Sequence, residues 1–453
     1  MKLYSENENY KLYQGNMLDI LEIIEPNSID SIITDPPYEL NFMNKGWDNS
    51  GIAFQKETWQ KCYDVLKPGG YLLAFGGSRT FHRIACAIED AGFEIRDTIM
   101  WLYGSGFPKS MNVGLAIDKK NGVESIDTGV VSPNARPNCD KTNTLYESGT
   151  VGKNFTIKKA TNKWEGWGTC LKPSFEPIIV ARKPFKGSLV DNVIEYGVGG
   201  INIDECRVEP TKEYLDSKGN ENTKKSGSIY GFSNYANLHI RANSNDLGRF
   251  PANTILTYDE TDFDEVCSGF PNGKRNGSIS KPYKISNQVY GEYGNCKPFE
   301  AYNDSGSASR YFYCAKASKK DRDEGLDEFE ESNSMCDRNP ELESANMPQN
   351  RSGNLRKNIH PTVKPTELMQ YLVRLVNPNS STILDPFNGS GSTGKAVMYE
   401  NREKNKNYKY IGIELTEEYL PIAKARIEYV CNLIKEDKKK SKQLDIFDCG
   451  DNL

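Results

Sequence analysis

Metal-binding and membrane signals are scarce in this sequence of 453 residues. It has three histidines, and no two of its 11 cysteines form a Cys-x-x-Cys pair. Because structural zinc sites are built from such cysteine and histidine pairs, we expect no metal and reduced, mostly buried thiols. No run of 18 apolar residues could span a membrane, and the first residues lack the apolar segment of a signal peptide. These absences predict a cytoplasmic protein that has no membrane partner.

Positive charge is not in excess either, because the net charge at pH 7 is −5. This argues against a protein coated in positive charge, although nucleic-acid binding requires only a local basic surface. Hydrophobic residues make up 37% of the chain and aromatic residues 11%, which is enough for a globular protein. The length predicts two or three domains rather than a single small fold.

The stretch TDPPY at 34–38 follows the apolar run 29–33, which is predicted to be a strand. Pro36 and Pro37 cannot donate backbone hydrogen bonds, so they end sheet pairing and hold the chain rigid, with carbonyl groups facing outward. Asp35 adds a carboxylate and Tyr38 an aromatic face. A rigid pair of acceptors beside a stacking ring suits a flat heterocycle that carries an amino group. The alternative interpretation is a plain strand-ending turn, since Asp-Pro turns are common.

Helices and strands alternate around this stretch. The strand 71–75 is apolar on successive residues, which predicts burial on both faces, as in a parallel sheet. Further core elements are expected as helices at 57–66 and 81–92 and strands at 93–102 and 176–182. Residues 104–168 show little periodicity and predict a long polar excursion. The acidic run 321–332 is predicted to be a mobile loop.

A second group of motifs lies near the end of the sequence. The strand 381–384 leads to Asp385 and to the glycine-rich turn 386–394, and the strand 408–413 is closed by Glu414. Helices are predicted on either side, at 366–376 and 416–434, and the charged run 438–442 is expected to be a solvated tail.

The glycine-rich turn and the acid that follows it are the parts of a nucleoside-cofactor site. Gly389 and Gly391 allow a ligand to approach backbone N–H groups closely. Glu414, at the end of the next strand, can accept hydrogen bonds from both ribose hydroxyls. A phosphate-binding P-loop is disfavoured, because Gly394 and Lys395 are followed by alanine where that motif needs serine or threonine.

Four stretches together carry a family resemblance: TDPPY at 34–38, HPTVKP at 360–365, LDPFNGSGSTG at 384–394 and YIGIEL at 410–415. The sequence resembles the beta-class amino DNA methyltransferases, the adenine-N6 and cytosine-N4 family, and is similar to their phage- and restriction-associated members. The resemblance implies an α/β fold, a Rossmann-like class I methyltransferase sheet built from both chain ends. It also implies a catalytic half at 1–185, an inserted target-recognition domain at 186–350, a cofactor-binding half at 351–436 and a polar tail at 437–453.

The resemblance assigns roles residue by residue. Asp35 and the Pro36 carbonyl would accept hydrogen bonds from the target amine, Tyr38 would stack on the base, and Lys364 could pair with the methionine carboxylate of S-adenosylmethionine. The full sets are, for catalysis, Asp35, Pro36, Pro37 and Tyr38, and for cofactor binding Asn16, His360, Thr362, Lys364, Asp385, Phe387, Asn388, Gly389, Ser390, Gly391 and Glu414. Asn16 departs from the family, which usually has aspartate after that glycine.

The function implied is methylation of the N6 amine of adenine in double-stranded DNA by direct transfer to a flipped-out base. Aspartate at the head of the Pro-Pro-Tyr motif favours adenine, while cytosine N4 would use the same geometry. Methylation of protein glutamine or RNA and a non-catalytic DNA-binding relative are the rivals. Possible partners include a cognate restriction endonuclease, and a monomer or a homodimer is expected. Arg241, Arg249 and Arg310 are weak candidates for reading the target sequence.

Overall fold

A computed structural model describes residues 2–40, 49–103, 110–131, 156–208, 248–259, 270, 272–275, 304–307, 312–331 and 356–448. The chain divides into two compact units. One, here called the core unit, comprises Met1–Gly104 and Phe175–Leu453, and the other, here called the hairpin unit, comprises Ser105–Ser174. Among the described residues no helix is both long and apolar enough to cross a membrane.

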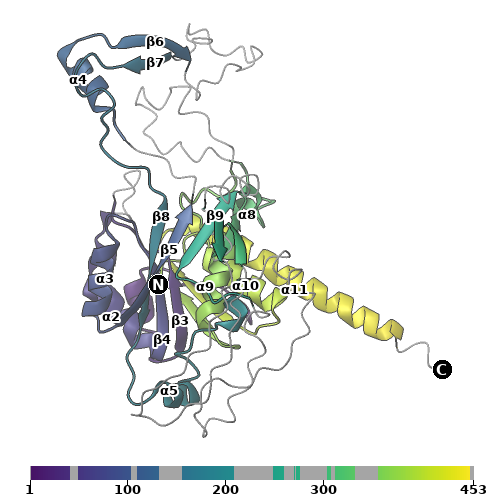
Figure 1. Cartoon of the computed structure of the whole chain (residues 1–453). Coiled ribbons are helices and arrows are strands. Elements are labelled where there is room, and N and C mark those ends of the chain that lie inside the picture. The colour runs from purple at the N-terminus through teal and green to yellow at the C-terminus, as the bar shows by residue number, and fades with distance from the viewer. Residues whose placement is uncertain are drawn as a thin grey trace, which may run out of the picture. The chain divides into compact units, whose positions relative to one another are not determined.

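A ten-stranded mixed sheet forms the centre of the core unit, in the order β1-β2-β14-β13-β3-β4-β8-β5-β9-β12 (Figure 1). Neighbours are parallel except at β1–β2, where the chain starts, and on both sides of β8. The strands are β1 Lys2–Glu6, β2 Tyr10–Gln14, β3 Ile29–Thr34, β4 Leu66–Phe75, β5 Glu94–Tyr103, β8 Phe175–Arg182, β9 Thr254–Asp259, β12 Tyr313–Ala317, β13 Thr382–Asp385 and β14 Lys409–Glu414. The central strands β14, β13, β3 and β4 come from both ends of the chain, which confirms the Rossmann-like arrangement.

Helices cover both faces of this sheet, as Figure 1 shows. Alternate residues of β3 point to opposite layers, because Ile32 packs with α1, α2 and α3 while Ile33 packs with α9, α10 and α11. The same alternation holds for Leu384 and Ile383 of β13. The helices are α1 Met17–Leu21, α2 Lys56–Val65, α3 Phe81–Asp90, α5 Leu189–Tyr196, α8 Lys319–Asp323, α9 Thr366–Val376, α10 Ser392–Glu403 and α11 Leu420–Asp448. Burial on both faces explains the continuous apolar runs of the central strands.

Short elements complete the described structure. The core unit has 3-10 turns η3 Ile52–Phe54, η4 Asp204–Cys206 and η8 Glu417–Tyr419 and a small ladder of β10 Asn272–Arg275 with β11 Asp304–Ser307. The hairpin unit consists of α4 Val113–Asn121 and the antiparallel pair β6 Ile126–Val131 and β7 Thr156–Lys159.

Three parts of the fold differ from the sequence-based expectation. Strands β9 and β12, which lie within the expected domain at 186–350, extend the central sheet beyond β5. The acidic run at 321–332 is expected to be mobile, but its first residues belong to α8 and the side chain of Leu326 is fully buried. Helix α11 continues to Asp448, through the lysine run expected to be a tail, because lysine and glutamate are good helix formers. Much of 186–350 lies outside the described residues, so the extent of a recognition domain stays a prediction.

Candidate active site

The carboxyl ends of three neighbouring parallel strands meet at one edge of the sheet. Asp35 directly follows β3, Asp385 is the last residue of β13, and Glu414 is the last residue of β14. The pairing of β13 with both β3 and β14 makes these three ends neighbours. Ligands of open α/β sheets bind outside the carboxyl ends of the strands. The two predicted motifs, TDPPY and the glycine-rich turn, therefore meet where a ligand is expected.

Asp35 forms an ion pair on one side of its carboxylate only. Its Oδ2 accepts a hydrogen bond from Nζ of Lys364 at 2.6 Å, whereas its Oδ1 is buried and has no partner among the described residues. A buried acceptor without a donor is unfavourable, by about 1–3 kcal/mol, and so marks a position where a ligand donor would fit. Burial raises the pKa of Asp35, and the ammonium of Lys364 opposes that shift.

Lys364 lies inside a cage of carboxylates and aromatic rings. Its Nζ is 3.5 Å from Oε2 of Glu176 and lies 5.0–5.9 Å from the ring centroids of Phe75, Tyr38 and Trp101. Burial alone would lower the pKa of Lys364, but the two adjacent carboxylates outweigh it and raise the pKa. The ammonium therefore stays charged at neutral pH, although its side chain is only 7% exposed.

Glu176 is the site residue that the sequence did not reveal. It lies on β8, and its carboxylate accepts hydrogen bonds from the hydroxyls of Tyr38 at 2.7 Å and of Tyr103 at 3.4 Å. The phenol of Tyr38 stays protonated, because burial and the nearby carboxylates of Asp35 and Glu176 raise its pKa well above the usual value. In the sequence Glu176 opens an apolar run that predicts a core strand. A charged residue at the start of a core strand was the available signal for a site residue.

The glycine-rich turn is fastened to Glu414. Its Oε2 accepts a hydrogen bond from the backbone N–H of Gly389 at 2.7 Å, and its Oε1 accepts one from the N–H of Thr416 at 2.7 Å. Burial nevertheless raises the pKa of Glu414 to about 7. Gly389 has a φ of +52°, and a Cβ there would lie 2.8 Å from Nε2 of His360. The turn therefore needs glycine at this position, for its backbone angle and for the close approach of the imidazole.

Asp385 links β3 to the glycine-rich turn. Its two carboxylate oxygens accept hydrogen bonds from the hydroxyls of Thr34 and Thr393, each at 2.6 Å, and Oδ1 also accepts one from the N–H of Phe387. Burial raises the pKa of Asp385 to about 6. All its contacts are internal, so in this structure Asp385 orients the two motifs relative to each other.

Residues 29–425 match a family of N6 and N4 methyltransferases described as DNA methylase. This chain belongs to that family. It is 36% identical over 255 residues to the type II methyltransferase M2.DpnII of Streptococcus pneumoniae, a match that covers 47% of this chain and 90% of that protein. It is 28% identical over 253 residues to the type II methyltransferase M2.LlaDCHI of Lactococcus lactis subsp. cremoris, covering 47% and 89%.

Among solved structures, the PvuII DNA methyltransferase, titled cytosine-N4-specific, aligns with 96% of this chain and 95% of its own at 12% identity and a TM-score of 0.40. The family match extends from β3 through the glycine-rich turn into α11, so it includes TDPPY and all three later motifs. The family resemblance predicted from those motifs is thus confirmed for this methylase.

The other predicted cofactor residues of the methylase surround the turn, and most are engaged within the protein. Oδ1 of Asn388 accepts a hydrogen bond from the Tyr410 hydroxyl at 2.7 Å, and the Ser390 carbonyl accepts one from the buried Arg426 at 2.8 Å. Phe387 lies 6.5 Å from the ring of Trp59, Gly391 takes a φ of +75°, and Oδ1 of Asn16 caps α1 by accepting from the N–H of Leu18. These contacts hold the turn rigid, and the roles of the residues toward a cofactor stay predictions.

His360 and Thr362 lie in the segment that precedes Lys364. The imidazole of His360 packs edge-on against Tyr419 at 4.6 Å, and its Nδ1 accepts a hydrogen bond from the N–H of Thr362 at 3.3 Å. Burial lowers the pKa of His360 to about 3, and the cations of Lys364, Arg322 and Arg426 add to the shift. The imidazole of His360 is therefore neutral at physiological pH.

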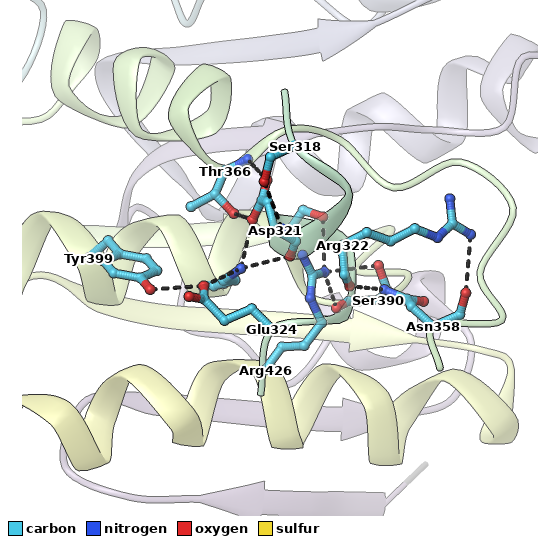
Figure 2. Close-up of polar contacts among 11 residues, drawn as sticks. Ser318, Asp321, Arg322, Glu324, Asn358, Thr366, Ser390, Tyr399 and Arg426 are labelled. Carbon is cyan, nitrogen blue, oxygen red and sulfur yellow. Dashed lines mark hydrogen bonds and ion pairs between the residues drawn. The ribbon is translucent and has the colours of Figure 1, made fainter. Parts of the chain in front are cut away.

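The acidic segment around α8 buttresses this part of the methylase (Figure 2). Asp321 and Glu324 form ion pairs at 2.7 and 2.8 Å with Nζ of Lys395, whose side chain is fully buried in α10. Asp321 also accepts from the N–H of Thr366 at 2.8 Å, which fixes the start of α9. The prediction of a mobile acidic loop is wrong here, because a buried ammonium requires carboxylates beside it. Lys395 is thereby occupied, in agreement with the exclusion of a phosphate-binding P-loop.

Proposed function

We propose that this methylase transfers a methyl group from S-adenosylmethionine to the N6 amine of adenine in double-stranded DNA. The observation that carries the proposal is the buried, unpartnered Oδ1 of Asp35, next to Tyr38 at the sheet edge where the glycine-rich turn also lies. An acceptor in that position is suited to an amine N–H. Aspartate at the head of the Pro-Pro-Tyr motif favours adenine over cytosine N4.

The protein's contribution to catalysis is orientation and electrostatics. An exocyclic amine is a poor nucleophile, because its lone pair is delocalised into the ring. Acceptors at Asp35 Oδ1 and the Pro36 carbonyl would take both amine hydrogens and shift electron density toward the nitrogen. Positive charge develops on that nitrogen as the N–C bond forms, and the Asp35 carboxylate stabilises it. The raised pKa of Asp35 also makes it a better acceptor for the proton that the amine must lose.

The residues around the glycine-rich turn fit a nucleoside cofactor. Both carboxylate oxygens of Glu414 lie at a strand end and hold one hydrogen bond each, which leaves them able to accept from ribose hydroxyls. Gly389 and Gly391 shape the turn beside which the methionine portion would lie, with Phe387 beside the ring system. S-Adenosylmethionine supplies an electrophilic methyl group on its sulfonium when bound. The ammonium of Lys364 uses two N–H groups on Asp35 and Glu176. Its third N–H is proposed to contact the methionine carboxylate.

A base inside a duplex cannot reach such a pocket, so the target base must be flipped out of the stack. Recognition of the target sequence is assigned to the range 186–350, because base edges have to be read by groups outside the family's shared core. Arg249 is described and forms a backbone bridge with Val208, while Arg241 and Arg310 lie outside the described residues. A cognate restriction endonuclease is the partner proposed for a methylase of this family.

Identification of the methylated nucleoside tests the proposal. Duplex DNA is incubated with the purified protein and S-adenosylmethionine carrying a labelled methyl group, digested to nucleosides and separated. The expected result is label in N6-methyl-2′-deoxyadenosine. Label in N4-methylcytosine would assign the alternative base, and label on protein or RNA but not on DNA would overturn the proposal.

A further inference from the structure

The hairpin unit differs in charge from the rest of the methylase. Ser105–Ser174 contains ten lysines and arginines against six aspartates and glutamates, a net charge of +4. Because the whole chain carries −5, the remaining residues carry −9. The hairpin unit is thus positively charged, whereas the rest of the chain is negatively charged. Local rather than total charge decides binding to nucleic acid, so this unit is suited to bind a polyanion.

A buried carboxylate holds one turn of this unit against α4. Asp118 of α4 is 2% exposed and accepts hydrogen bonds from the N–H and the hydroxyl of Thr161, at 2.8 and 2.9 Å, and from Nδ2 of Asn162 at 2.8 Å. The carbonyl of Gly114 accepts a further bond from Asn162 at 3.0 Å. The N–H of Val113 donates to the carbonyl of Trp167 at 2.9 Å, so both ends of the turn are tied to the helix.

This anchored turn presents two tryptophans to solvent. Trp164 is 37% exposed and Trp167 is 59% exposed, and their rings meet edge to face at 5.1 Å. Large aromatic side chains are normally drawn into a core, and here a rigid hydrogen-bonded turn holds a pair of them outside it. Exposed aromatic faces on a rigid support act as stacking or packing surfaces for a ligand.

One lysine lies next to the tryptophans, and two more lie at the end of α4 that holds their turn. Nζ of Lys163 is 5.7 Å from the ring centroid of Trp164, and Lys119 and Lys120 directly follow Asp118, the residue that holds the turn. All three lysines are exposed, and within the described part of the chain none forms an ion pair. Exposed cations on the same compact unit as exposed aromatic rings suit the phosphates and sugars of a nucleic acid.

We propose that the hairpin unit is a second DNA-contacting surface of this methylase. It would hold the duplex through phosphate contacts of Lys119, Lys120 and Lys163 and through packing of Trp164 and Trp167. The proposal rests on DNA being the substrate and adds to it a surface outside the range 186–350. Because phosphate contacts carry no sequence information, this surface contributes affinity to any duplex, not only to the target.

Two variants and a matched control test the surface. Lys119→Gln with Lys120→Gln removes two exposed charges from the hairpin unit. Lys404→Gln with Lys409→Gln removes two exposed charges from the core unit, where Lys409 opens β14 and Lys404 follows α10, both at the sheet edge opposite the active site. Trp167→Ala removes the more exposed ring without touching the anchoring hydrogen bonds of Asp118. Thermal midpoints and cofactor affinity of every variant check that the protein is folded.

Binding of a fluorescent 30-base-pair duplex is measured between about 50 and 200 mM salt, with target and random sequences. The first variant should reduce the slope of log K against log salt by about 0.9 for each phosphate that its lysines no longer neutralise, equally for both duplexes. Trp167→Ala should weaken binding of both duplexes by about 2- to 5-fold, the size expected for loss of one small apolar contact with sugars, and the control should match the wild type.

Unchanged slopes and affinities in both test variants would overturn the inference while leaving the proposed function intact. Self-association of the wild type that Trp167→Ala abolishes, with DNA binding unaffected, would also overturn it and assign the surface to a second copy of the chain. Failure of the wild type to bind any duplex would instead contradict the proposed function, so the two failures are distinguishable.

Discussion

Substitution of Asp35 should separate the chemistry of the site from its stability. In Asp35→Ala the ammonium of Lys364 loses its 2.6 Å partner and keeps only Glu176, 3.5 Å away. Because Glu176 remains as a counter-charge, the ammonium is not left uncompensated, and the variant should lose less than the ~3–5 kcal/mol expected when a buried charge loses its only partner. If Asp35 only capped a turn at the surface, its substitution would lower the stability by about 1 kcal/mol. With one counter-charge retained at 3.5 Å, a loss between these two values is expected.

The same substitution should abolish most methyl transfer. It removes the acceptor whose Oδ1 is available to the target amine, and loss of one preorganised group facing developing charge lowers kcat by about 10²- to 10³-fold. Asp35→Ala combined with Lys364→Met also removes the ammonium and leaves Glu176 without its cation, so the lost stability should not return. Activity should stay low in the double variant, because the acceptor is still missing.

Asp30→Ala is the matched control for this experiment. Asp30 lies at the other end of β3 and forms its own 2.6 Å ion pair with Lys67, away from the predicted chemistry. Single-turnover methyl transfer and denaturant unfolding are measured on all four proteins. Asp30→Ala should lose stability and keep its turnover when folded. A folded Asp35→Ala protein that binds cofactor and turns over at nearly the wild-type rate would refute the proposed role of Asp35.

Three further predictions concern the surrounding residues. Glu414 must be ionised to accept from both ribose hydroxyls, and its folded pKa is about 7, so cofactor affinity should rise with pH up to about 7. Without cofactor, the raised pKa should make the stability of the fold decrease as the pH rises from 4.5 to 7. Glu414→Gln should remove both pH dependences. Glu176→Gln keeps an acceptor for Tyr38 but removes a charge that raises the pKa of Asp35. The acid limb of the pH profile of kcat should therefore move to lower pH. An unmoved limb would count against a positioning role of Glu176. Gly389→Ala should lower the thermal midpoint and cofactor affinity more than Gly122→Ala, which has a similar positive φ and no atom within 4 Å of its Cβ.

The elements that could be predicted are those whose signal is local. The strand expected at 29–33 is β3, Ile29–Thr34, and the apolar run at 71–75 lies at the buried end of β4. Strand ends are marked by abrupt changes from apolar residues to proline, glycine or acid, which is why the sequence alone places Asp35 and Glu414 at the ends of strands. The motif resemblance then joined the two chain ends, which no local signal does.

The elements that could not be predicted depend on partners distant in sequence. Lys395 is a lysine within a helical pattern, and nothing near it in the chain shows that it is fully buried. Its counter-charges come from Asp321 and Glu324, more than 70 residues earlier, in a run whose composition alone indicates a solvated loop. The acidic run is ordered because buried cations need it, and such pairing is visible only in three dimensions.

Glu176 and Lys364 show the same limit at the active site, with a consequence for catalysis. The sequence suggested that Lys364 faces the cofactor, and the structure places its ammonium between the carboxylates of Asp35 and Glu176. Two carboxylates around one ammonium leave the cluster with a net negative charge, and the remaining Asp35 oxygen is directed to no donor among the described residues. On the proposed function, a site of that charge would stabilise an amine that becomes positive during methyl transfer, whereas a neutral Asp35–Lys364 pair alone would contribute less. Glu176, on the antiparallel strand β8, would thus add the charge that makes the Asp35 carboxylate effective in the proposed reaction.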